Sequence, residues 1–247
     1  SNTGTITWAL DLGKERLHRY LVDFGFNQKT DLDFPYEASG VLKSLENWSG
    51  VEIATTGMGQ GIDVTPIQML SAYNALANGG VYVSPQIISS IAHSSGEKEY
   101  VATSPSRRVI GEQAAREMTQ MLAAVVSRGT ARKAGVPGYA IAAKTGTARK
   151  VQPNGTYEDE EGLYRYASTV VGYFPASAPE LSMIVIIDEP TDNFYASETA
   201  APLFGDLASW ALRHYKISPS SDLVYSVSTQ GETSNLTVDE SGSEGAQ

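Results

Sequence analysis

"YAIAAKTGTARK", residues 139–150, begins as a buried strand and then changes character. It is apolar through Ala143, and then places a lysine, two threonines and a glycine in a row at residues 144–147. Two further strand-like runs follow at residues 166–173 and 181–187. Apart from the acidic loop "PNGTYEDEEG", the connections are short, which favours antiparallel pairing of neighbouring strands.

Helical patterns precede these strands. Apolar residues at helical spacing predict a short helix over residues 14–24. Thr65, Pro66 and Gln68 have the order of an N-cap, a first turn and a capping box, so a second helix is predicted from there to Ala77.

The rest of the chain adds strands and two helices. Residues 80–93 predict a strand, a turn and a second strand. A helix over residues 112–126 has an apolar face made of Ala115, Met118, Leu122, Val125 and Val126. A closing helix is marked by Leu203, Phe204, Leu207, Ala208, Ala211 and Leu212. This order predicts an α+β fold, an antiparallel sheet flanked by helices.

Composition divides the chain into two parts. Residues 1–217 carry the apolar patterns of a folded domain. Residues 218–247 are rich in serine, threonine, glycine and acidic side chains, and predict a flexible tail.

Charge and residue content exclude several classes of function. The chain has 28 acidic and 18 basic residues, a net charge of -10, and no basic run, so nucleic acid is not expected as a partner. It has no cysteine, and His18, His93 and His214 are isolated, so no metal site is expected. No apolar run approaches the length of a membrane span, so we expect this piece to be soluble and any anchor to lie outside it.

Two interpretations of residues 144–147 require no acyl chemistry. Lysine and threonine are common where a strand edge runs into solvent, and Gly146 would then mark a bulge. A phosphate-binding loop is disfavoured, because Ala143 stands where that motif has its second glycine and the preceding residues indicate an extended chain.

An acyl-transfer site on a strand edge explains all four residues. Lys144 would supply a fixed positive charge, and the Thr145 and Thr147 hydroxyls would hold a substrate carboxylate. Gly146 would let a substrate backbone approach closely enough to pair as an extra strand.

The segment Lys144-Thr145-Gly146-Thr147 resembles the Lys-Thr-Gly motif of the penicillin-recognising serine acyltransferases. Residues 52–88, "EIATTGMGQGIDVTPIQMLSAYNALANGGVYVSPQII", are similar to the stretch that precedes this motif in class B, monofunctional penicillin-binding proteins. Residues 166–190 resemble the two strands that follow it, and residues 199–204 the start of the closing helix. The resemblance extends from Asn2 to about Tyr215 and indicates the C-terminal part of a transpeptidase domain.

This resemblance implies a penicillin-binding/β-lactamase-like transpeptidase fold without the N-terminal part of the domain. It also implies a peptidoglycan D,D-transpeptidase, which cross-links the cell wall by serine acyl transfer without a metal or organic cofactor. By similarity, Lys144 would orient the motif hydroxyls and stabilise charge, Thr145 and Thr147 would bind the terminal carboxylate, and the Thr147 amide would form half of an oxyanion hole.

The resemblance also implies partners and a location. Expected partners are stem peptides ending in D-Ala-D-Ala, β-lactam antibiotics, and proteins of division or elongation. The parent protein would act at the extracytoplasmic face of the cell membrane, held by an N-terminal anchor outside this sequence.

The expected nucleophile is missing. No Ser-x-x-Lys precedes residues 52–88, and three internal serines, Ser39, Ser44 and Ser127, lack the lysine. If "SNTG" is the end of the family's Ser-Ser-Asn-x-Gly, Asn2 is the motif asparagine and the nucleophile lies before residue 1. The chain alone would then be inactive. Ala196-Ser197 stands where relatives often carry paired glycines, and we expect this difference not to touch the chemistry.

Two other functions stay open. One is a catalytically silent penicillin-binding-like module that holds cell-wall or divisome partners. The other is a D,D-carboxypeptidase or β-lactamase of the same superfamily, which passes the acyl group to water. The long class B match at residues 52–88 weighs against the second.

Overall fold

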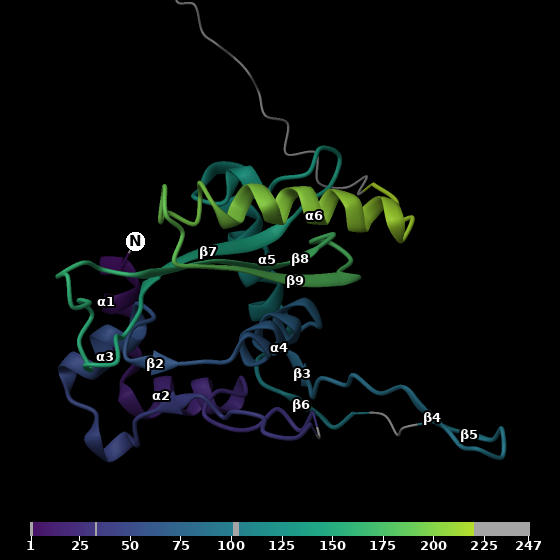
Figure 1. The fold of residues 1–247 in the computed structure, drawn as a ribbon, viewed down its shortest axis with the longest axis horizontal. Coiled ribbons are helices and arrows are strands. Elements are labelled where there is room, and N and C mark those ends of the chain that lie inside the picture. The colour runs from purple at the N-terminus through teal and green to yellow at the C-terminus, as the bar shows by residue number, and fades with distance from the viewer. Residues whose placement is uncertain (1, 33, 101–103, 220–247) are drawn as a thin grey trace, which may run out of the picture.

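The computed structural model describes residues 2–32, 34–100 and 104–219 (Figure 1). The tail predicted for residues 218–247 therefore lies outside the described residues from position 220 onward. The helices are α1 (Asn2–Leu12), α2 (Lys14–Asp23), α3 (Gly50–Gly57), α4 (Pro66–Ala77), α5 (Glu112–Arg128) and α6 (Ala200–His214), with 3-10 turns η1 (Leu45–Asn47) and η2 (Arg132–Ala134). The strands are β1 (Val41–Leu42), β2 (Ile62–Asp63), β3 (Val81–Val83), β4 (Ser90–Ala92), β5 (Lys98–Tyr100), β6 (Ser106–Arg108), β7 (Ala142–Arg149), β8 (Tyr166–Phe174) and β9 (Leu181–Asp188).

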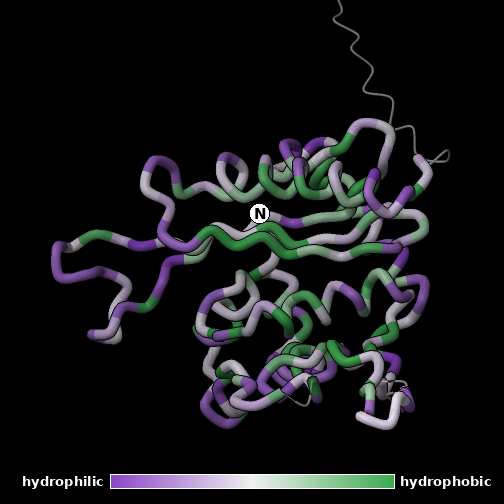
Figure 2. Tube along the Cα trace, turned by 45° about the vertical axis from the view of Figure 1, so that its right-hand side comes forward, coloured by the Kyte–Doolittle hydropathy of each residue, from purple (hydrophilic) through white to green (hydrophobic). Residues whose placement is uncertain are grey.

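A three-stranded antiparallel sheet in the order β7-β8-β9 forms the centre of the molecule. Its register is continuous, and places Lys144 opposite Val171 on β8. The sheet lies between α6 on one side and α4 with α5 on the other (Figure 1). Figure 2 shows its strands as largely hydrophobic bands between these layers. The predicted α+β fold, with three paired strands and flanking helices, is confirmed.

Alternation along β7 divides its residues between two cores. Ala143 packs with Phe204 of α6 in the larger core. Ala142 packs with Leu122 of α5 and Tyr173 of β8 in the smaller core, which residues of α4 close. Because successive strand residues point to opposite faces, these two alanines fix which way each side chain of the motif points.

The predicted helices form close to their expected bounds. Thr65 caps α4, and its side chain and that of Gln68 make the reciprocal hydrogen bonds of a capping box. Three details of the predicted apolar faces are wrong: Met118 is 39% exposed on α5, and Leu203 and Leu207 are about as exposed on α6. A helical stripe is wider than the surface its neighbours cover, so its border residues remain in water.

Two helices and one pattern of strand pairing were not expected. α1 and α3 pack against each other so closely that a Cβ on Gly57 would lie 2.6 Å from Cβ of Ala9. The strands predicted in residues 80–93 exist, but β3 pairs with β6 and β4 pairs with β5. Residues 85–100 consequently form a separate arm, which projects from the lower right in Figure 1.

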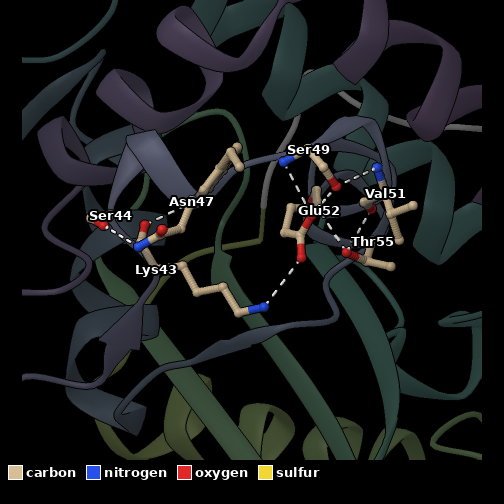
Figure 3. A network of polar contacts seen from close by, with 8 residues as sticks. Lys43, Ser44, Asn47, Ser49, Val51, Glu52 and Thr55 are labelled. Atoms are coloured by element: carbon tan, nitrogen blue, oxygen red, sulfur yellow. Dashed lines mark hydrogen bonds and ion pairs between the residues drawn. The ribbon is translucent and has the colours of Figure 1, made fainter.

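A polar network fixes the start of α3 (Figure 3). The carboxylate of Glu52 accepts hydrogen bonds from the hydroxyl and the N–H of Ser49, and forms an ion pair with Lys43 at 3.2 Å. These contacts, with the Ser49 hydroxyl contributing most, lower the pKa of Glu52 from 4.5 to about 2. The network therefore stabilises α3, and through α3 the packing of α1, most strongly when Glu52 is ionised.

Replacing Glu52 by glutamine should cause a loss of stability that depends on pH. A pKa that is lower in the folded state gives stability that is complete above pH 4.5 and is lost as the pH falls toward 2. We expect Glu52→Gln to be less stable than wild type at pH 7, with the difference shrinking at pH values below 4.5. Urea unfolding at several pH values measures this. Ser49→Ala should show the same trend, whereas a difference that stays constant with pH would contradict the assignment.

The close approach of β7 and β8 depends on Gly172. A Cβ at this position would lie 2.4 Å from the main-chain oxygen of Ala142 and 2.6 Å from Cβ of Ala143. Gly172→Ala should therefore cost about 1–3 kcal/mol, because β7 must shift. Thermal unfolding measures the loss. Gly50→Ala, where a Cβ has no neighbour within 4 Å, is the control and should not lower the melting temperature.

Candidate active site

The Lys-Thr-Gly segment lies on an open edge of the sheet. Within the described residues, β7 pairs with β8 alone. The hydrogen bond from the Lys150 N–H to the Arg165 oxygen continues the ladder, which makes the even-numbered residues of β7 the ones that exchange hydrogen bonds with β8. The N–H and C=O groups of Thr145 and Thr147 therefore point away from β8. An extended peptide could pair with these groups.

Side chains of the segment flank this edge from both faces. Lys144 and Gly146 lie on the same face as Ala142, toward α4 and α5, whereas Thr145 and Thr147 lie toward α6. The structure thus brings the four residues together along one edge. The Lys144 Nζ donates a hydrogen bond to the main-chain oxygen of Thr145 at 2.7 Å, and the role toward the motif hydroxyls that the resemblance gives Lys144 stays a prediction.

The charge of Lys144 is held close to the open edge. Its side chain is exposed, yet the surrounding protein displaces part of its water, and this desolvation lowers the pKa of Lys144 below its ordinary value. A cation with reduced hydration attracts an anionic ligand more strongly than a fully hydrated one.

Thr145 has a hydroxyl partner that the sequence did not indicate. Its Oγ1 lies 2.6 Å from Oγ1 of Thr130, which follows the C-terminal end of α5. When Thr130 donates in this pair, the hydrogen of the Thr145 hydroxyl remains available for a ligand carboxylate. In the sequence, the segment of residues 127–130 drew attention only because Ser127 was a possible nucleophile. Nothing in that pattern indicated that Thr130 would contact Thr145.

Thr147 is fixed by the loop before α6. The N–H of Ala196 donates to Oγ1 of Thr147 at 3.1 Å, and Ala196 is buried. The contact uses the main-chain N–H, which a glycine at position 196 would also supply, so the expectation that the Ala196-Ser197 difference does not touch the chemistry stays a prediction. A hydroxyl that accepts from a fixed amide has its own hydrogen free, so this contact orients Thr147 as a donor.

Gly146 is not required by the fold around it. A Cβ there would meet Cβ of Thr169 at 3.9 Å, which is an ordinary contact, and its backbone is not in the left-handed region. The register runs through the Gly146–Thr169 pair without interruption, so the bulge considered for this glycine is absent from β7. The extended backbone of β7 also excludes the phosphate-loop interpretation.

Asn2 is not brought to these residues by any described hydrogen bond. It is exposed at the first position of α1, where its main-chain oxygen accepts from the Thr5 hydroxyl at 3.0 Å. α1 packs against α2 and α3. The role assigned to Asn2 by the resemblance stays a prediction.

One Ser-x-x-Lys does occur in the chain, at Ser95 and Lys98. The two residues span the turn of the β4–β5 hairpin, where Gly96 has φ 88°. A serine and a lysine three positions apart adjoin on a helix, but here a turn separates them. Figure 1 shows this hairpin projecting away from β7, so the pair supplies no nucleophile to the open edge.

The remaining candidate groups have structural contacts. The ring of His18 packs edge-on against Trp48, His93 lies 3.2 Å from Glu99, and His214 stacks on Trp210. In the described part of the chain, no three potential metal ligands cluster. Nor is any of its helices both long and apolar enough to cross a bilayer.

Comparison with known proteins identifies the family. The model for the penicillin binding protein transpeptidase domain matches residues 1–209. The chain belongs to this family. The resemblance to class B penicillin-binding proteins, drawn from the Lys-Thr-Gly motif and residues 52–88, is thereby confirmed, with relatives and solved structures that agree.

Curated relatives of the transpeptidase family match almost the whole chain. Stage V sporulation protein D of Bacillus subtilis is 34% identical over 240 residues, which are 96% of this chain and 36% of that protein. Penicillin-binding protein PbpB of Mycobacterium tuberculosis is 35% identical over 90% of this chain and 34% of its own length. Peptidoglycan D,D-transpeptidase FtsI of Escherichia coli is 32% identical over 89% and 35%. The chain thus spans about a third of the length of these relatives.

Solved structures share the fold. Penicillin binding protein 3 from Mycobacterium tuberculosis, in complex with aztreonam, has a TM-score of 0.82 and 35% identity, over 89% of this chain and 50% of that one. The transpeptidase domain of penicillin-binding protein 3 from Burkholderia pseudomallei has a TM-score of 0.76 and 30% identity, over 89% and 63%. The penicillin-binding transpeptidase fold predicted from the sequence is confirmed by these matches.

The contact between Thr147 and Ala196 can be tested by stability. Thr147→Val removes the acceptor and leaves the buried Ala196 N–H unpaired, which should cost about 1–3 kcal/mol. Thr147→Ser keeps the hydroxyl and should cost much less. Urea unfolding compares the two variants, and equal losses would show that the hydroxyl does not fix this loop.

Proposed function

We propose that the chain supplies the substrate-binding edge of a serine D,D-transpeptidase that cross-links peptidoglycan. The observation that carries this proposal is the open edge of β7, where the outward N–H of Thr147 lies beside the hydroxyls of Thr145 and Thr147 and the charge of Lys144. The family membership of residues 1–209 and the names of the relatives support it.

The substrate strand would pair with the outward backbone groups of Thr145 and Thr147. Its terminal carboxylate would accept hydrogen bonds from the two threonine hydroxyls, with Lys144 supplying positive charge nearby. The carbonyl oxygen of the penultimate D-alanine would lie against the Thr147 N–H, which stabilises the negative charge that develops there. Thr130 and Ala196 would act as positioning residues, because each holds one of these hydroxyls.

The chemical step requires a serine that this sequence does not provide. That serine would attack the penultimate carbonyl, form an ester and release the terminal D-alanine, which takes a proton as it leaves. The amine of a neighbouring stem peptide would then attack the ester and form the new peptide bond, and the proton that this amine loses would go to the departing serine oxygen. Neither step requires a metal or an organic cofactor.

We further propose that β-lactams enter the same edge as mimics of D-Ala-D-Ala. Two of the solved relatives are complexes with aztreonam and with ampicillin. The whole protein would work at the extracytoplasmic face of the membrane, next to its peptidoglycan substrate and the proteins of division or elongation. Asn2 would belong to the family's Ser-x-Asn motif at the same site.

Acylation by a penicillin tests the function directly. Intact-protein mass should show a stable penicilloyl adduct on a chain extended upstream through Ser-x-x-Lys, and none on residues 1–247 alone. In the extended chain, Lys144→Ala should slow acylation by about 100-fold, because it removes a charge aimed at the reacting group. A folded extended chain that forms no adduct would favour the catalytically silent module. Rapid release of the adduct to water would favour the carboxypeptidase or β-lactamase alternative.

Replacing Gly146 should slow acylation without lowering the stability of the fold. Gly146→Ala adds a methyl group on the face of β7 that carries Lys144, where the protein itself leaves room. We expect an unchanged melting temperature and at least a tenfold slower acylation in the extended chain, since the methyl group would obstruct a bound strand. Gly50→Ala again serves as control. Normal acylation in Gly146→Ala would contradict the proposed approach of the substrate.

A further inference from the structure

A second open strand edge lies on the arm formed by residues 85–100. The arm contains the two-stranded sheet of β4 and β5, which pair with each other alone among the described residues. It projects from the body of the molecule beside β3 and β6 (Figure 1). A hairpin with three residue pairs has little stability of its own in water, so a further strand would stabilise it.

The hydrogen bonds of the hairpin show which groups are free. The His93 N–H donates to the Glu97 oxygen, which continues the ladder and makes Ile91 and Glu99 a hydrogen-bonded pair. The N–H and C=O groups of Ser90 and Ala92 therefore point away from β5. They form a short row of donors and acceptors on the outer side of β4.

The two edges of the arm differ in their protection. β5 carries Lys98 and Glu99, and charged side chains on an edge strand discourage pairing with other chains. β4 consists of Ser90, Ile91 and Ala92, without a charge or a proline. The outer edge of β4 is thus the one suited to accept a strand.

Apolar side chains continue this edge toward the body of the protein. Ile87 is 59% exposed, Ile88 47% and Ile91 48%, all within five residues of one another. At the root of the arm, a hollow of about 380 Å³ is walled by Val83 and Pro85 on one side and by Tyr173 and Glu180 on the other. Its volume is at the small end for a ligand site, and fits the anchoring side chain of a protein partner better than a free metabolite.

The acidic groups near the arm favour a partner that carries positive charge. Glu97 and Glu99 flank Lys98 on the hairpin, so acidic groups outnumber this lysine there, and Glu180 adds a further carboxylate at the root of the arm. The chain as a whole has a net charge of -10, which disfavours pairing of two copies through this edge. We propose that β4 is a docking strand for another protein, which adds an extended segment of alternating basic and apolar residues to the arm and anchors in the hollow. This proposal does not rest on the transpeptidase function, because the arm is separate from β7.

A peptide of alternating lysine and valine that ends in tryptophan is a suitable probe. In the whole protein, hydrogen exchange should show protection of the Ser90 and Ala92 amides on adding the peptide. Ala92→Pro removes one outward N–H without removing a hydrogen bond of the β4–β5 ladder, and should weaken binding at least tenfold. Ala92→Val keeps the N–H and is the matched control. Both variants should retain the wild-type melting temperature.

Several outcomes would overturn the proposal. Equal binding by wild type and Ala92→Pro would show that the outward N–H is not used, and absence of binding would show that the edge accepts no such strand. Equal or tighter binding of a glutamate-valine peptide would contradict the charge argument. Protection of Ser90 and Ala92 by dimerisation without any peptide would identify a second copy as the occupant.

Discussion

The constraint on which the rest of the structure depends is the pairing of β7, which in the described part of the chain has β8 as a partner on one side and no strand on the other. The lack of a side chain on Gly172 lets β7 approach β8 closely at Ala142 and Ala143, and the paired register continues from there through Lys144 to Arg149. A central strand would use all its backbone groups internally. As an edge strand, β7 instead leaves the N–H and C=O groups of alternate residues unpaired. Its first residues, Ala142 and Ala143, are buried, so the accessible unpaired groups are those of Thr145 and Thr147.

Packing around the edge strand produces the chemistry of the segment. Ala142 and Ala143 enter different cores, so the residues that follow must alternate between the α4–α5 face and the α6 face. This alternation separates Lys144 from the hydroxyls of Thr145 and Thr147. Each hydroxyl then meets a group supplied by a distant part of the chain: the Thr145 hydroxyl shares a hydrogen bond with Thr130, and the Ala196 N–H donates to the Thr147 hydroxyl.

Local signals in the sequence predicted much of this, and non-local contacts explain what they missed. The cap at Thr65 and the strand over β7 depend on neighbouring residues, and both could be predicted. The partners of β3 and β4 are set by segments further along the chain, and no local pattern specifies them. The same holds for the site. Residues 144–147 are contiguous and could be identified from the sequence, whereas Thr130 and Ala196 are distant in the sequence and are brought to the site only by folding.

Two glycines near the candidate site show how a structural requirement can be distinguished from a functional one. Gly172 cannot carry a side chain because β7 fills the space that a Cβ would need. Gly146 faces a gap that the protein does not fill, in a register that any residue could adopt. When the fold does not require a glycine at a position, a bound ligand that needs the space of the missing side chain is an alternative explanation. On an edge with outward amides, two threonine hydroxyls and a partly desolvated cation, the ligand we propose is an extended chain ending in a carboxylate.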